Sequence, residues 1–223
     1  RCAAPCCEKI SKQSYNLIIE EIIKFLEENP KETVQKLTLE MKECAKALDV
    51  EKAAKIRDNI DAIKEAITDN TAAIIVEPVQ GEGGFNVCPP EFMTFLREIC
   101  DLHGILLIAD EVQTGFGRTG KLFCFQNYDI MPDVVSTAKG IGGGLPLGCV
   151  MFSEKTENVL VAGDHATTFG GNPVATAGAE YILKTMDDDF LKEVEKKGEY
   201  MREKILSMPH VVGIDGLGLM MGI

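Results

Sequence analysis

The sequence predicts an α/β fold with a mainly parallel sheet and helices on both faces, preceded by an all-α segment. From about residue 68, short apolar runs that are typical of buried strands alternate with helical patterns. Residues 11–67, by contrast, show helical periodicity almost throughout. The charge balance changes at the same point, because residues 1–67 hold 12 Lys/Arg and 13 Asp/Glu, whereas residues 68–223 hold 11 and 22. We therefore predict two parts, residues 1–66 and 67–223.

The first part is predicted to contain three helices. Ser11 or Ser14 can cap the first, which ends before Pro30. The second covers about residues 33–48, and the third begins near residue 51. Only residues 49 and 50 separate the second helix from the third, so we expect these two helices to form an antiparallel hairpin.

The second part is predicted to alternate strands and helices in the order of a parallel sheet. The expected strands are residues 72–76, 105–109, 133–137 and 149–152, and the expected helices are 89–103, 172–186 and 189–208. Ligands bind at the carboxyl ends of strands in such sheets, so the loops that follow the strands are the place to look for chemistry.

Composition excludes several classes of function. The 223 residues include no apolar run long enough to cross a bilayer and no secretory signal at the start, so we expect a cytoplasmic protein. The acidic second part argues against direct binding of nucleic acid or membrane. Eight scattered cysteines favour reduced thiols over a disulfide framework. Because the chain opens with Arg1, we expect part of a longer or processed product.

Two residues at the ends of neighbouring predicted strands carry the chemistry. Asp110 ends one strand, and Lys139 follows the next. Pyridoxal phosphate (PLP) needs this pair, because a carboxylate keeps its ring nitrogen protonated and a lysine amine holds its aldehyde as a Schiff base. Taken alone, the pair could equally be a strand-end ion pair, and the glycine-rich residues 114–120 give only a weak dinucleotide signal.

Longer strings resemble a known family. LLIADEVQTGFGRTGKLF, GDHATTFGGNPVA and VEPVQGEGG resemble class III aminotransferases of fold type I, nearest to acetylornithine aminotransferases and their ornithine, succinylornithine and 4-aminobutyrate relatives. The resemblance covers about residues 67–223. It implies a partial large domain of a PLP-dependent transferase.

The resemblance also implies a role for individual residues. Lys139 would hold the cofactor covalently and act as the catalytic base. Three residues near it would bind the cofactor ring: Asp110 its nitrogen, Val112 its face and Gln113 its phenolic oxygen. Thr168 would donate to the cofactor phosphate across a homodimer interface.

Three further residues receive roles from the same resemblance. In substrate binding, Glu82 would pair with an arginine that reads the substrate and Thr167 would lie near the substrate, although Glu82 could be an exposed loop carboxylate and Thr167 could simply bond backbone. Glu77 would be a structural acid at the end of its strand.

The implied reaction is the ping-pong transfer of an ω-amino group from an amino acid to 2-oxoglutarate, as in arginine biosynthesis. The resemblance begins at the family's mid-point. We therefore expect the phosphate loop, the aromatic residue that stacks on the ring and the arginine that binds the substrate carboxylate to be missing, so that this chain alone is incomplete as an enzyme.

Residues 1–63 resemble a different family, the C component of the ABC excinuclease, including its UVR motif. Matching positions in the predicted hairpin are Met41, Ala45, Leu48, Ala53, Ala54, Arg57 and Asp58. The alternative function is thus a protein-interaction fragment of a nucleotide excision repair protein that contacts the B component of the excinuclease through residues 33–63, and an inactive chimera is a third. Cys2 and Cys6 match the last pair of a four-cysteine cluster whose first pair is absent, so we expect no metal site.

Overall fold

The computed structural model describes residues 56–223. The chain divides into two units, residues 1–59 and residues 60–223. Most of the predicted hairpin, together with Cys2 and Cys6, lies outside the described residues. Residues 56–66 are helical, as predicted, and Ile63 and Ile67 pack against the core of the second unit. No helix within residues 56–223 is long and apolar enough to span a membrane.

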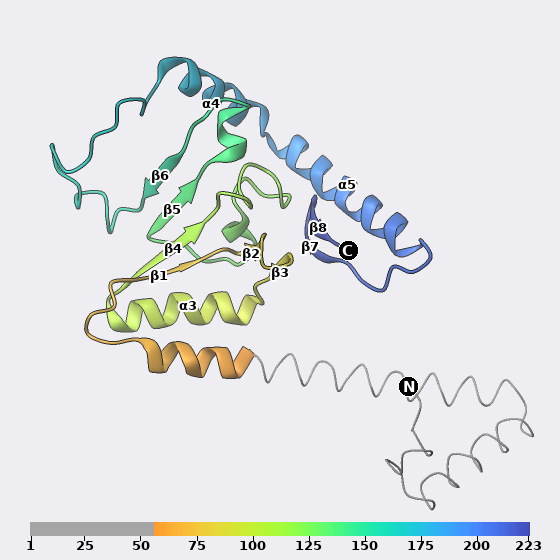
Figure 1. Ribbon diagram of the computed structural model, residues 1–223, viewed down its shortest axis with the longest axis horizontal. Coiled ribbons are helices and arrows are strands. Elements are labelled where there is room, and N and C mark those ends of the chain that lie inside the picture. Colours follow the sequence, from red (N-terminus) through yellow and green to blue (C-terminus); the bar gives the residue numbers. More distant parts are fainter. Residues whose placement is uncertain (1–55) are drawn as a thin grey trace, which may run out of the picture. The chain divides into compact units, whose positions relative to one another are not determined.

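A four-stranded sheet forms the centre of the second unit (Figure 1). Its strands are β1 (Ala73–Val76), β4 (Leu106–Asp110), β5 (Val134–Thr137) and β6 (Cys149–Phe152), in the order β1-β4-β5-β6. The first three strands run parallel, and β6 is antiparallel to β5. All four strands were predicted to within one residue, because each is an apolar run bounded by turn-forming residues.

Helix α3 (Pro90–His103) covers one face of this sheet. Its buried side chains include Met93, Leu96 and Cys100, which form one apolar cluster with Leu107 of β4. Each large apolar side chain that is fully buried contributes about 1.5–3 kcal/mol to stability. The helix begins after Pro89 and ends at Gly104, whose φ of 66° is a left-handed conformation that glycine adopts without strain.

The opposite face of the sheet departs from the prediction of helices on both faces. The strand register places Ile75, Val150 and Phe152 on that face, and their exposed fractions are 63%, 53% and 44%. Among the described residues, α4 (Pro173–Thr185) instead packs on η3 (Lys139–Gly142), near the end of β5. The described helices therefore leave this sheet face open.

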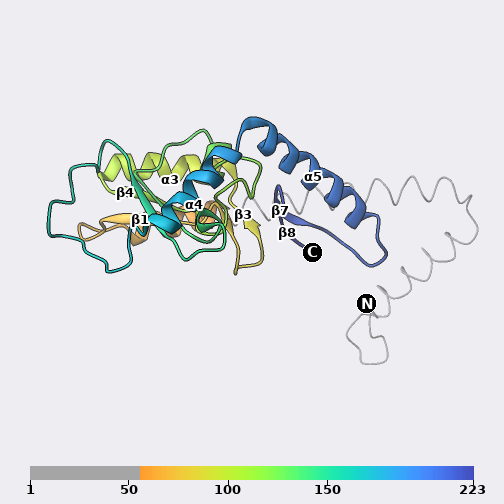
Figure 2. The same cartoon turned by 90° about the horizontal axis from the view of Figure 1, so that it is seen from above.

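Two small hairpins were not predicted. Strands β2 (Val79–Gln80) and β3 (Asn86–Val87) form the first, and β7 (Asp215–Leu217) and β8 (Met220–Gly222) form the second. Helix α5 (Asp188–Leu206), which Asp187 caps, runs alongside β7 and β8 in both views (Figures 1 and 2). Strands of two or three residues are too short for their periodicity to show in the sequence.

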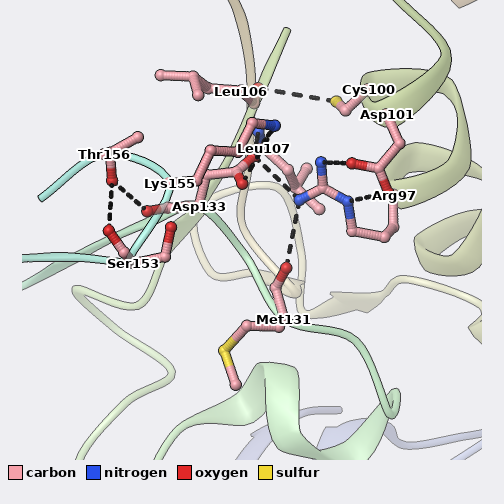
Figure 3. Close-up of polar contacts among 10 residues, drawn as sticks. All are labelled: Arg97, Cys100, Asp101, Leu106, Leu107, Met131, Asp133, Ser153, Lys155 and Thr156. Carbon is pink, nitrogen blue, oxygen red and sulfur yellow. Dashed lines mark hydrogen bonds and ion pairs between the residues drawn. The ribbon is translucent and has the colours of Figure 1, made fainter. Parts of the chain in front are cut away.

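A polar network ties the amino end of the sheet together (Figure 3). Asp133, just before β5, accepts hydrogen bonds from the Leu107 amide at 2.8 Å and from Arg97 Nη1 at 3.0 Å. Lys155 Nζ lies 3.4 Å from the same carboxylate, and Arg97 also pairs with Asp101 on its own helix. The network thus connects α3, β4, β5 and the segment after β6.

The four cysteines of the described residues are free thiols: Cys88, Cys100, Cys124 and Cys149. Burial, aided by the nearby Glu77, raises the pKa of Cys88 to about 11. Burial likewise raises the pKa of Cys124 to about 12. Both thiols are therefore protonated at neutral pH and behave as small apolar side chains of the core.

Candidate active site

The candidate site is built at the carboxyl ends of β4 and β5. Asp110, the last residue of β4, is the register partner of Ser136 in β5. Lys139 lies two residues beyond the end of β5 and begins η3, with a φ of 49°. A left-handed conformation costs a non-glycine residue about 1–2 kcal/mol. Such strain is typical of functional positions, where the surrounding structure compensates for it.

A tight turn after β4 presents the next two predicted residues. Asp110 Oδ1 accepts a hydrogen bond from the Val112 amide at 3.0 Å, and the Gly115 amide bonds to the Glu111 carbonyl at 3.0 Å. A Cβ on Gly115 would lie 2.8 Å from that carbonyl oxygen, so the turn has no room for a side chain there. The turn directs Val112 and Gln113 toward the cavity beside Lys139.

The cavity has a volume of about 330 Å³. Its lining consists of Phe85, Val112, Gln113, Gly115, Phe116, Arg118, Lys139, Gly140, Leu219, Met220 and Met221. Two of these residues are cationic and none is acidic, although residues 68–223 as a whole carry 11 Lys/Arg against 22 Asp/Glu. Such a lining favours an anionic ligand.

Two residues of this region received no role from the sequence. Arg118 lies on the exposed part of the glycine-rich segment and lines the cavity. Glu111, between Asp110 and Val112, is completely buried. The place of Arg118 within the glycine-rich segment could have marked it as a site residue. Nothing in the sequence distinguishes Glu111 from an exposed acidic residue of a loop.

Buried Glu111 holds the turn from inside. Its Oε1 accepts a hydrogen bond from the Phe125 amide at 2.8 Å, and its Oε2 accepts one from the Thr114 hydroxyl. Burial raises the pKa of Glu111 above its ordinary value, although the hydrogen bonds from Thr114, Cys124 and Phe125 oppose that rise.

Hairpin β2–β3 brings the two other predicted acids close to the site. Glu77 Oε2 accepts a hydrogen bond from the Gly81 amide at 3.2 Å, as a structural acid at a strand end should. Gly81 abuts Gln113, since a Cβ on Gly81 would lie 2.6 Å from Gln113 Oε1. Glu82, the next residue, is exposed at the hairpin turn and does not line the cavity.

Asp110, Thr167 and Thr168 are not in the cavity wall either. Asp110 is half-buried beside it, held by the turn. Thr167 and Thr168 lie on an exposed loop between β6 and α4. The structure therefore joins Lys139, Gln113 and Val112 in one cavity, places Asp110 and Glu82 on segments next to it, and leaves the two threonines apart.

This arrangement is suited to PLP. The cavity offers a lysine amine, a side-chain amide and the branched face of Val112, and Arg118 adds a positive charge that suits an anionic ligand. The fold and the site thus define an α/β protein with a lysine at the carboxyl edge of a mainly parallel sheet, of the kind that holds a carbonyl cofactor.

A known family matches most of the chain. The model of the family described as "Aminotransferase class-III" matches residues 18–223, so the chain belongs to the class-III aminotransferases. Enzymes of this family use pyridoxal phosphate. The match begins within the segment predicted to be separate, and the division at residue 66 stays a prediction.

Curated relatives are acetylornithine aminotransferases. The protein of Corynebacterium efficiens is 45% identical over 166 residues, which cover 74% of this chain and 41% of that protein. The protein of Methanopyrus kandleri is 46% identical over 167 residues, which cover 74% and 43%. The chain thus spans less than half the length of these relatives.

Solved structures that superpose on this chain are also aminotransferases. The ornithine aminotransferase of Toxoplasma gondii ME49 superposes with a TM-score of 0.67 at 37% identity, over 72% of this chain and 40% of that one. The N-acetylornithine aminotransferase of Stenotrophomonas maltophilia K279a gives a TM-score of 0.59 at 35% identity, over 66% and 39%. The α/β fold class is therefore confirmed.

These relatives give no support to the resemblance between residues 1–63 and the C component of the excinuclease. That resemblance and the contact with the B component stay predictions, which fall mainly on residues outside those that the structure describes. The cytoplasmic location also stays a prediction.

Proposed function

We propose that this chain is the lysine-bearing part of a PLP-dependent aminotransferase of the acetylornithine or ornithine type. The observation that carries the proposal is the shared cavity of Lys139, Gln113 and Val112 at the carboxyl ends of β4 and β5. The family membership and the acetylornithine aminotransferase relatives support it.

When bound, PLP supplies a carbonyl carbon that takes up an amino group and a ring that accepts electrons. The Lys139 amine would hold the cofactor through that carbon, and the same amine would move a proton to and from the substrate carbon that bears the amino group. The Asp110 carboxylate would accept the hydrogen bond of the protonated ring nitrogen. The Gln113 amide would donate to the phenolic oxygen, and Val112 would pack on the ring face.

The substrates in this proposal are an ω-amino acid and 2-oxoglutarate. Both carry carboxylates, which agrees with a cavity wall that holds Arg118 and Lys139 and no acid. The proposal assigns Glu82 to the substrate side of the site; in support, its neighbour Gly81 lies against Gln113.

The proposal includes a homodimer in which Thr168 of one subunit reaches the cofactor phosphate of the other. In support, the loop that carries Thr167 and Thr168 is exposed, and so are its apolar residues Val161 and Phe169. An exposed apolar loop of this kind is typical of a surface that another subunit covers.

Covalent labelling of the lysine tests the cofactor site. The purified chain is mixed with PLP, reduced with borohydride and digested. We expect a visible band that borohydride bleaches and one labelled peptide, containing Lys139. Lys139→Ala should lose the label, whereas Lys121→Ala, which removes a surface lysine paired with Glu195, should keep it. Equal labelling of the two variants would refute the assignment.

Mixed dimers test the role of Thr168. Lys139→Ala and Thr168→Ala chains are mixed, and cofactor affinity is measured in the mixture. If Thr168 acts across the interface, one of the two sites in each mixed dimer regains both residues, and about a quarter of all sites in a randomly paired equimolar mixture bind PLP normally. A mixture that binds no better than the separate variants would place Thr168 elsewhere.

A further inference from the structure

Glu111 differs from every other acid near the site because it is fully buried and uses both carboxylate oxygens. One oxygen binds the Phe125 amide and the other binds the Thr114 hydroxyl. Without these two hydrogen bonds, a buried carboxylate would cost several kcal/mol. The fold therefore retains Glu111 at a position where an apolar residue would be simpler.

The main chain of the same residue connects the two strands of the site. The Glu111 amide donates to the Ser136 carbonyl of β5 at 2.8 Å, and its carbonyl accepts from the Gly115 amide at 3.0 Å. Ser136 lies three residues before Lys139. A shift of Glu111 would thus move the Asp110 turn and the end of β5 relative to each other.

Phe125, which donates to the Glu111 carboxylate, is itself held by apolar packing. Phe125 packs in one buried cluster with Ala109 of β4 and Val135 of β5. Phe123, whose ring stacks on that of Phe125, extends this packing to Phe116, a residue of the cavity wall. The Glu111 carboxylate therefore joins the turn to an apolar layer beneath both strands.

We infer that Glu111 is a positioning residue, whose buried carboxylate fixes the turn after β4 and so sets Asp110, Val112 and Gln113 relative to Lys139. It touches neither substrate nor cofactor in this role. The inference deepens the proposed function and rests on it for its purpose, although the positioning can be measured without cofactor.

Variants at Glu111 separate positioning from plain stability. Glu111→Ala removes both hydrogen bonds, whereas Glu111→Gln can keep both, because its oxygen accepts from Phe125 and its amide donates to Thr114. Thr114→Val removes one donor only, and it serves if Glu111→Ala does not fold. The matched control is Asp133→Ala, which removes a buried carboxylate at the other end of the same strands.

The readout is amide hydrogen exchange of the full chain over seconds to minutes, without PLP. We expect exchange in residues 110–117 and 137–142 to be at least tenfold faster in Glu111→Ala, a smaller increase in Thr114→Val, and a change below twofold in Glu111→Gln. Asp133→Ala should leave these two segments within twofold and loosen residues 97–107 instead. A uniform increase in Glu111→Ala, or no increase in Thr114→Val, would overturn the inference.

The cofactor gives a second, independent readout. In Glu111→Ala the rate of borohydride-trapped labelling at Lys139 should fall at least tenfold, while Glu111→Gln should stay close to the parent chain. If the parent chain takes up no PLP, the proposed function fails, and the exchange pattern still decides the role of Glu111.

Discussion

The two ends of the central sheet are held in different ways. At the amino end, the Asp133 carboxylate bonds to a backbone amide, an arginine and a lysine, and it joins four segments (Figure 3). At the carboxyl end, the turns after β4 and β5 contain glycines and a lysine with a positive φ, and they line a cavity of about 330 Å³. The buried Glu111 carboxylate holds these turns by accepting a hydrogen bond from the Phe125 amide.

The difference shows that the two ends of strands β4 and β5 serve different purposes, stability at one end and the proposed site at the other. Charge pairing at the amino end stabilises the sheet but leaves no free group for chemistry, since each partner of Asp133 is already bonded. The carboxyl end places the groups of the proposed site, Lys139 and Gln113, in a cavity wall. Turns that approach closely are needed there, because side chains from separate segments must meet around one small ligand.

The largest effect is expected from Asp133→Ala. The substitution leaves Arg97 and the Leu107 amide without their buried partner, and the Asp133 side chain is only 9% exposed. Removing one member of a buried ion pair costs about 3–5 kcal/mol. Thermal unfolding followed by circular dichroism should show a Tm roughly 6–20 °C lower, while PLP labelling of folded protein at Lys139 stays unchanged. A parallel loss of labelling would break the division between the two ends.

The two buried carboxylates should respond to pH in opposite directions. Burial alone would raise the pKa of Asp133, but the Leu107 amide and the Arg97 guanidinium outweigh it and hold that pKa below its ordinary value. Its contribution to stability is therefore full above the unfolded-state pKa of about 4 and is lost as the pH falls through the folded-state pKa. For Glu111, whose pKa is raised, the contribution is present at low pH and is lost as the pH rises through the folded-state pKa.

Denaturant unfolding between pH 3 and pH 8 measures this contrast. The parent chain should exceed Asp133→Asn in unfolding free energy at pH 7, and the gap should narrow toward pH 3. The unfolding free energy of Glu111→Gln should rise relative to that of the parent chain as the pH rises. Gaps that do not vary with pH would show that neither carboxylate changes its pKa on folding.

The smallest effects are expected from a pair of glycines at the two ends. Gly104→Ala, at the end of α3, places alanine at a φ of 66° in open space, and about 1 kcal/mol of stability should be lost through backbone strain alone. Gly81→Ala should cost no more, because the Gln113 side chain can move away from the new methyl group. Only Gly81→Ala should alter the visible spectrum of bound PLP, since only Gly81 touches a residue of the site.

Local patterns were enough to predict much of this molecule. The four strands of the sheet and helices α3, α4 and α5 follow from apolar runs and helical periodicity in the sequence. The ends of adjacent parallel strands predicted that Asp110 and Lys139 lie at one edge of the sheet, and the family resemblance added Val112 and Gln113. The structure places Lys139, Gln113 and Val112 in the cavity wall and Asp110 beside it.

Contacts between distant residues could not be predicted. Asp133 is 36 positions from Arg97, and Glu111 is 14 from Phe125, so no periodicity connects them. Hairpin β7–β8 contributes Leu219 and Met221 to the cavity from the far end of the chain. The open sheet face was also not predicted, because the apolar sequence of a strand does not show whether helices cover one or both of its faces.

Residue strings and apolar runs were enough to predict the family and the order of the strands along the chain, since these depend on neighbours within a few positions. Which acids are buried followed only from the packing of segments that lie far apart in the chain. Glu111 and Glu82 are the same residue type in loops that follow strands, yet one is enclosed by Thr114 and Phe125 and the other is exposed. Burial depends on what the rest of the chain packs around a position, and that is fixed only when the strands and helices meet.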